Sequence, residues 1–169
     1  MKTKRLTTMA LLTAIALTIF MIEAQIPPMV PVPGVKIGLA NIVTVFAVFA
    51  LGPGDAAMIL ASRIFLGAVF AGNFSSIIFS AAGGGFAILV TILLRRILTK
   101  KQLWVAGSLG AVAHSVGQIA VAVVWTGTPS VLMYLPVLMA ISIVTGFCTG
   151  LAAQFLVNRG NITWTTASK

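Results

Sequence analysis

The sequence predicts an all-α integral membrane protein with six transmembrane helices. Its 169 residues are 59% hydrophobic and only 8% charged, and the mean hydropathy is +1.11. A soluble domain of this length would need far more polar surface than these residues supply. Long apolar segments recur along the whole chain, and the basic residues stand mostly at their ends. We therefore expect one transmembrane domain over residues 1–169.

The first three apolar segments are separated by prolines and glycines. A spanning helix needs roughly 20 apolar residues. The first candidate is 6–24, which we interpret as a retained helix and not a cleaved signal peptide. The proline-rich stretch 25–34 cannot be regular helix, because proline lacks an N–H donor and restricts the residue before it. The second and third helices are expected at 37–51 and 56–71, with a break at 52–55, and both are short for a full span.

The last three segments are bounded by basic residues and by one turn. The fourth helix is expected at 74–94, where two arginines end it. The fifth is expected at 103–125, after two lysines at 100 and 101. Residues 126–129, Thr-Gly-Thr-Pro, are typical of a turn, and they lead into a sixth helix at 131–157.

The placement of basic residues predicts that both termini are cytoplasmic. Lysine and arginine are enriched on the cytoplasmic side of membrane proteins. With the N-terminus inside, the outer loops hold only Lys36. The cytoplasmic ends then hold Lys2, Lys4, Arg5, Arg95, Arg96, Lys100, Lys101, Arg159 and Lys169. This distribution accounts for the formal charge of +9 without nucleic-acid binding.

Acidic residues are so scarce that they limit the chemistry of the chain. Glu23 and Asp55 are the only two. Catalysis by paired carboxylates or by a carboxylate-bound metal is therefore not expected, and we predict no catalytic residues, no metal site and no cofactor. A lone histidine without neighbouring cysteines supports the same view. The sequence has no phosphate-binding loop, so any ATP hydrolysis would belong to another subunit.

Ionisable and amide side chains inside the apolar segments are the candidate substrate-binding residues, because such groups are costly in lipid. Arg63 lies within the third segment and needs either an acidic ligand group or an internal partner, such as Glu23 or carbonyl groups. Lys36 and Asn41 follow the proline-rich stretch, where they would form one wall of an outward pocket. For Lys36 the alternative is snorkelling to water, and for Asn41 it is interhelical hydrogen bonding.

Three further residues are candidates for the same pocket. His114 and Gln118 are four residues apart on the fifth helix and so share a face. Asn73 lies near the expected outer boundary, after the third segment. An ordinary packing or hydrogen-bonding role is the alternative for His114.

Small residues mark faces where helices can approach closely in lipid. The first segment carries Ala10 and Ala14, four residues apart. The fourth carries the run 80–85, Ser-Ala-Ala-Gly-Gly-Gly, and the sixth carries Gly146 and Gly150. For the fourth and sixth segments we expect packing inside the protein.

Several stretches resemble one family. They are Pro33-Gly-Val-Lys-Ile-Gly-Leu-Ala-Asn-Ile-Val43, Leu51-Gly-Pro53, Arg63 and Ser80-Ala-Ala-Gly-Gly84. Over about 6–159 the chain is similar to the Gx transporter family, also labelled heptaprenyl diphosphate synthase component I. That family in turn resembles the substrate-binding S components of energy-coupling factor (ECF) transporters, which are six-helix bacterial membrane proteins. Their first helix docks through an Ala-xxx-Ala motif, which Ala10 and Ala14 match.

The resemblance implies a function in transport. It predicts a non-enzymatic S component in the bacterial cytoplasmic membrane that captures a small acidic or amphipathic molecule, such as a vitamin or an isoprenoid or quinone precursor. Its partners would be a transmembrane coupling subunit and two ATPase subunits. The alternative is a non-catalytic accessory subunit in prenyl diphosphate or quinone metabolism, or in a membrane redox assembly. Usual prenyl diphosphate synthases hold magnesium with two aspartate-rich motifs, whereas this chain has one aspartate.

Overall fold

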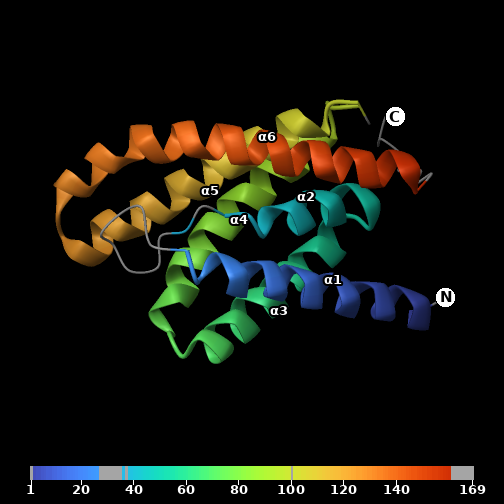
Figure 1. Cartoon of the computed structure of the whole chain (residues 1–169), viewed down its shortest axis with the longest axis horizontal. Helices are drawn as coiled ribbons and strands as arrows, with labels where there is room; N and C mark the ends of the chain where they lie inside the picture. The colour runs from blue at the N-terminus through green and yellow to red at the C-terminus, as the bar shows by residue number, and fades with distance from the viewer. Residues whose placement is uncertain (1, 27–35, 37, 100, 161–169) are drawn as a thin grey trace.

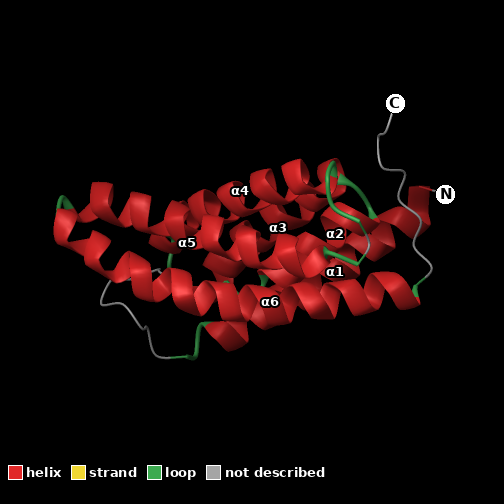
Figure 2. Ribbon diagram, turned by 90° about the horizontal axis from the view of Figure 1, so that it is seen from above, coloured by secondary structure: helices red, strands yellow, loops and turns green. Residues whose placement is uncertain are grey.

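The computed structural model describes residues 2–26, 36, 38–99 and 101–160. They form a bundle of six α-helices, and the described part contains no strand (Figures 1 and 2). A short 3₁₀ helix, η1 (Pro129–Tyr134), precedes the last helix. The α-helices are α1 (Lys2–Glu23), α2 (Asn41–Ala50), α3 (Pro53–Ala71), α4 (Ser75–Arg95), α5 (Leu103–Thr126) and α6 (Leu135–Arg159).

Five of the helical segments are long and apolar enough to cross a membrane. The exception is α2, whose 10 residues rise only about 15 Å, half the thickness of a hydrocarbon core of roughly 30 Å. The expected six helices are therefore present, and five of them are long enough to be full spans within the described residues. The structure supports a multi-pass membrane protein in which α2 is a short helix packed among longer ones.

Four helix starts differ from the sequence-based expectation by three or four residues. The first helix begins at Lys2 and not at residue 6, and the sixth begins at Leu135 and not at residue 131, because η1 precedes it.

The second helix was expected from residue 37 but begins at Asn41, after Gly38, whose φ of 85° lies in the left-handed region. The third was expected from residue 56 but begins at Pro53. Gly52, with φ of 113°, turns the chain before it. Proline is tolerated in a first turn because its missing N–H would have no helical partner there.

Glycines allow α5 and α6 to touch backbone to backbone. A Cβ atom added to Gly107 would lie 2.6 Å from the Cα of Gly150, and one added to Gly146 would lie 2.7 Å from the Cα of Ser108. On the opposite side of α5, a Cβ on Gly117 would lie 2.8 Å from the carbonyl oxygen of Ala82 in α4. The small residues of α4 and α6 thus serve internal packing, as expected.

Most basic residues lie at one end of the bundle, which we call the basic end. Here α1 begins, α4 ends, α5 begins and α6 ends, so the first and last helices have their chain-terminal ends together (Figure 1). Arg96, Lys101 and Arg159 are exposed there. Residues 27–34 of the expected proline-rich stretch lie outside the described residues.

Candidate functional site

Polar side chains from four helices and one connecting segment meet in the middle of the bundle. Five of them are buried, with exposed fractions from 1% to 4%, and Lys36 is partly buried. The group, which we call the central polar cluster, consists of Glu23, Lys36, Asn41, Arg63, His114 and Gln118. All except Glu23 are residues that the sequence predicts as substrate-binding. The fold brings these five together although they span positions 36 to 118 of the sequence.

Glu23 is the only carboxylate in the cluster, and it is occupied by the backbone. As the last residue of α1, it accepts a hydrogen bond from the N–H of Gly38. It acts electrostatically on Lys36 and Arg63, but among the described residues neither cation forms an ion pair with it. The direct Glu23–Arg63 salt bridge that was one of the expected alternatives is thus not found among the described residues.

Both cations of the cluster lie against one aromatic ring. The Nζ atom of Lys36 is 3.5 Å from the centroid of the Phe20 ring, and the Cζ atom of Arg63 is 5.5 Å from it. Such cation–π contacts attract a cation without neutralising it. Gly67 makes room for the ring, since a Cβ atom there would lie 2.8 Å from Phe20 Cε1.

Phe20 is therefore a cluster residue that sequence reasoning missed. It looks like an ordinary apolar residue of a membrane helix. The available signal was its position one turn before Glu23, on the same face of α1.

The guanidinium of Arg63 has a nitrogen that finds no hydrogen-bond partner among the described residues. The side chain is 4% exposed, and its Nη2 atom is buried without a partner. Arginine carries five N–H donors and stays charged in proteins. A buried charge that is neither paired nor hydrogen-bonded is strongly unfavourable. Arg63 therefore provides free donors in the interior of the bundle.

Two neighbouring groups show the same lack of partners. Among the described residues, neither the oxygen nor the nitrogen of the Asn41 amide has a hydrogen-bond partner, and Nδ1 of His114 lies against the Gly83 backbone without a hydrogen bond of ordinary geometry. The backbone of Gly38 lies between them, since a Cβ there would be 3.0 Å from both Asn41 Nδ2 and His114 Cδ2. Most buried polar groups in proteins are satisfied, so a concentration of unsatisfied ones indicates a place for a ligand.

Gln118 has a structural contact that its neighbours lack. Its Oε1 atom accepts a hydrogen bond of 3.1 Å from the backbone N–H of Lys36, which ties the connecting segment to α5. His114 and Gln118 share a face, as their spacing predicts, and that face packs on Gly83 of α4. Burial lowers the pKa of the Lys36 ammonium, an effect that Glu23 opposes.

Asn73 is the predicted site residue that the structure places elsewhere. It lies in the turn between α3 and α4 and is exposed. Its Oδ1 atom accepts a hydrogen bond of 2.6 Å from Ser75, and its carbonyl oxygen accepts one of 2.7 Å from Ser76. These contacts start α4, and a ligand-binding role for Asn73 stays a prediction.

The net charge of the cluster and its unpaired hydrogen-bonding groups limit what it can bind. Two cations face one carboxylate, and free donors come from Arg63 and Asn41. An anionic group placed beside Arg63 would supply the missing acceptors. Among the described residues no three histidine, cysteine, aspartate or glutamate side chains are grouped as metal ligands would be.

A separate groove of about 420 Å³ runs between α1 and α3. The predicted docking residues Ala10 and Ala14 lie in it, and both are exposed. Ser62, the neighbour of Arg63, lines its other wall. The groove residues are Leu6, Met9, Ala10, Thr13, Ala14, Leu17, Met58, Ile59, Ser62 and Leu66.

At the basic end an ion pair fastens α1 to α3. Arg5 donates to Asp55 through Nε at 2.7 Å and through Nη2 at 2.5 Å. Asp55 lies in the first turn of α3, where a carboxylate also interacts favourably with the helix dipole. The Asp55 side chain is 6% exposed, so its charge is fully used inside the chain.

Comparison with known proteins assigns the chain to a family. A family model described as heptaprenyl diphosphate synthase component I matches residues 12–156, from α1 to the last turns of α6. Comparisons with curated proteins and with solved structures give no match. The match includes every residue of the central polar cluster. This chain therefore belongs to the heptaprenyl diphosphate synthase component I family.

Proposed function

We propose that this protein is the substrate-binding subunit, or S component, of an ECF-type importer, and that it captures a small anionic or amphipathic molecule. The observation that carries the proposal is the buried Arg63 guanidinium, whose Nη2 atom has no hydrogen-bond partner among the described residues. A purely structural arginine would be expected to have carbonyl or carboxylate partners. The proposed ligand provides them through an acidic group.

The binding residues follow from the cluster. Arg63 holds the acidic group, and Lys36 adds positive charge nearby. Asn41 offers one donor and one acceptor to a neighbouring polar edge of the ligand. His114 and Gln118 form the wall on α5. Vitamin-like acids, and isoprenoid or quinone precursors with an acidic group, have this combination of features.

Orientation follows the positive-inside rule, with the basic end in the cytoplasm of a bacterial cell. The opposite end, which holds the α3–α4 turn and η1, then faces outward. In this arrangement α1 and α3 carry both functional regions: Phe20, Glu23 and Arg63 lie at the cluster, whereas Ala10 and Ala14 lie in the groove.

The α1–α3 groove is the proposed docking surface for a transmembrane coupling subunit. Small residues allow a partner helix to approach closely in lipid, and the groove leaves Ala10 and Ala14 uncovered. The chain lacks a phosphate-binding loop, so two ATPase subunits would supply the energy. This chain itself would not be an enzyme.

Native mass spectrometry of the purified protein tests the binding role. The wild-type protein is expected to retain an anionic small molecule, and Arg63→Ala is expected to lose it. Arg96→Ala, at an exposed position of the basic end, is the control and should retain it. Unchanged retention by Arg63→Ala would contradict the assigned role of Arg63.

The family name supports a second candidate, a non-catalytic membrane component of a prenyl diphosphate synthase or of a related quinone or redox assembly. The only aspartate of this chain is Asp55, and its carboxylate is hydrogen-bonded by Arg5. Aspartate-rich magnesium sites would therefore have to come from another subunit. Co-purification separates the two candidates. Coupling and ATPase subunits would favour the importer, and a soluble prenyl synthase would favour the accessory component.

A further inference from the structure

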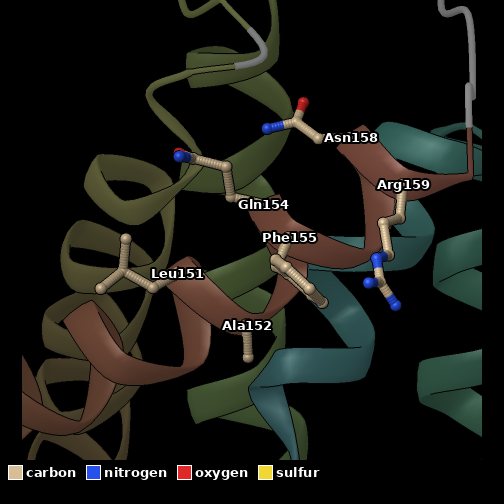
Figure 3. Close-up of a pocket in the computed structure, with 6 residues that line it drawn as sticks. All are labelled: Leu151, Ala152, Gln154, Phe155, Asn158 and Arg159. Carbon is tan, nitrogen blue, oxygen red and sulfur yellow. The ribbon is translucent and has the colours of Figure 1, made fainter.

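A second candidate site lies at the basic end of α6, away from the central polar cluster. A groove of about 650 Å³ is lined there by Leu151, Ala152, Gln154, Phe155, Asn158 and Arg159. Figure 3 shows the amides of Gln154 and Asn158 extending to one side of Phe155, with the Arg159 guanidinium on its other side. The guanidinium carbon is 5.1 Å from the centroid of the Phe155 ring.

The groove changes from apolar to cationic along the helix. Leu151, Ala152 and Phe155 come first, whereas Asn158 and Arg159 lie at the end. From residue 151 to 159 the helix rises about 12 Å. A phospholipid has the same order of properties along its length, with acyl chains followed by a phosphate.

The hydrogen-bond donors of the groove also favour an anion. The Oε1 atom of Gln154 accepts a hydrogen bond of 3.2 Å from the N–H of Leu103, which leaves the amide nitrogen as a donor. This bond also holds the start of α5 beside the groove. Lys101, two residues before Leu103, is exposed and brings a second cation to this level.

No side-chain carboxylate of the chain is available to these cations. Glu23 and Asp55 are the only acidic residues. Asp55 is bound by Arg5, and Glu23 is buried in the central polar cluster. Among the described residues, Arg159 therefore has no carboxylate as a counter-charge.

We propose that this groove binds an anionic phospholipid, with its phosphate at Arg159 and an acyl chain along Phe155 and Leu151. The site differs from the central polar cluster in its residues and its end of the molecule, so the proposal does not depend on the importer function. The occupant is a lipid and not a soluble phosphate, because the cationic groups continue directly into an exposed apolar surface.

The test is a lipid titration of the full-length protein in detergent, followed by native mass spectrometry. Dioleoylphosphatidylglycerol and dioleoylphosphatidylcholine share acyl chains and differ in headgroup charge. The wild-type protein is expected to bind the anionic lipid about fivefold more tightly, the factor for about 1 kcal/mol per basic residue near a charged lipid surface. Arg159→Gln should remove this preference, whereas Arg96→Gln should preserve it.

Two further measurements keep the test specific. Phe155→Ser should weaken binding of both lipids, because it removes the apolar surface. Unchanged unfolding temperatures of the variants confirm that the fold is intact. The proposal is overturned if the wild type binds both lipids equally, if Arg96→Gln and Arg159→Gln reduce the preference equally, or if inorganic phosphate displaces the anionic lipid.

Discussion

The two carboxylates of this protein lie in contrasting surroundings. Asp55, at the basic end, receives two hydrogen bonds from Arg5, so both of its oxygens are paired. Glu23, in the central polar cluster, accepts a bond from the Gly38 backbone, and its two cationic neighbours, Lys36 and Arg63, rest on the Phe20 ring.

We propose that the contrast separates a structural polar contact from a ligand-binding one. At the basic end the chain provides both charges of the pair, and the result fastens α1 to α3. In the cluster, Nη2 of Arg63 and both polar atoms of the Asn41 amide have no partners among the described residues, which reduces stability. Natural proteins accept such a loss mostly where a ligand completes the site.

The largest expected effect comes from Arg63→Met. We expect the loss of a charged partner to weaken binding of an anionic ligand by about 2–5 kcal/mol, or roughly 30- to several-thousand-fold. In the ligand-free protein the same substitution should leave the unfolding temperature unchanged or raise it, because it removes a buried cation with no ion pair and with an unpaired Nη2 atom among the described residues. Ligand retention in native mass spectrometry and thermal unfolding in detergent measure the two effects. A lower unfolding temperature would identify Arg63 as a structural residue and remove the contrast.

Breaking the pair at the basic end should have the opposite effect on stability. Arg5→Gln leaves the Asp55 carboxylate buried without its counter-charge, so the unfolding temperature should fall. The double variant Arg5→Gln/Asp55→Asn should recover part of the loss, since a neutral amide does not need a cation. Under conditions in which they are folded, both variants should still retain the ligand. If the double variant unfolds at the same temperature as Arg5→Gln, the unpaired charge of Asp55 is not the cause of the lost stability.

Asn41 and Gln118 offer a matched comparison within the cluster. Asn41→Leu removes an amide with no partners, so stability should be unchanged or higher. Gln118→Leu removes the acceptor of the Lys36 N–H and should reduce stability by about 1–3 kcal/mol. Chemical unfolding of the two variants under the same conditions measures the difference. Equal destabilisation would mean that Asn41 has a structural role like that of Gln118.

The smallest expected effect concerns Phe20. Phe20→Leu removes the ring that contacts Lys36 and Arg63, and the lost cation–π attraction should reduce stability by about 1–2 kcal/mol. Phe20→Tyr keeps an aromatic face and should retain most of the stability. Thermal unfolding of both variants is the measurement. If the leucine and tyrosine variants unfold at the same temperature, the ring face does not hold these cations.

Much of the site could be predicted because polar residues are rare in this chain. Arg63, His114 and Gln118 stand out against apolar neighbours, and their cost in lipid indicates a role. Phe20 and Gly38 could not be found in this way, because a phenylalanine or a glycine is ordinary in a membrane helix. Asn73 shows the opposite case: its position near a helix end suggested a ligand contact, but the structure uses its side chain and carbonyl to start α4.

The sequence by itself determined that this is a helical membrane protein with a basic end and almost no carboxylates. These properties depend on composition and on the order of residues along the chain, and hydropathy measures them directly. Only the tertiary structure decided that Asp55 pairs with Arg5, and that Arg63 has no such ion-pair partner among the described residues. Those outcomes depend on which side chains meet across helices more than 20 residues apart, and no local pattern specifies such contacts.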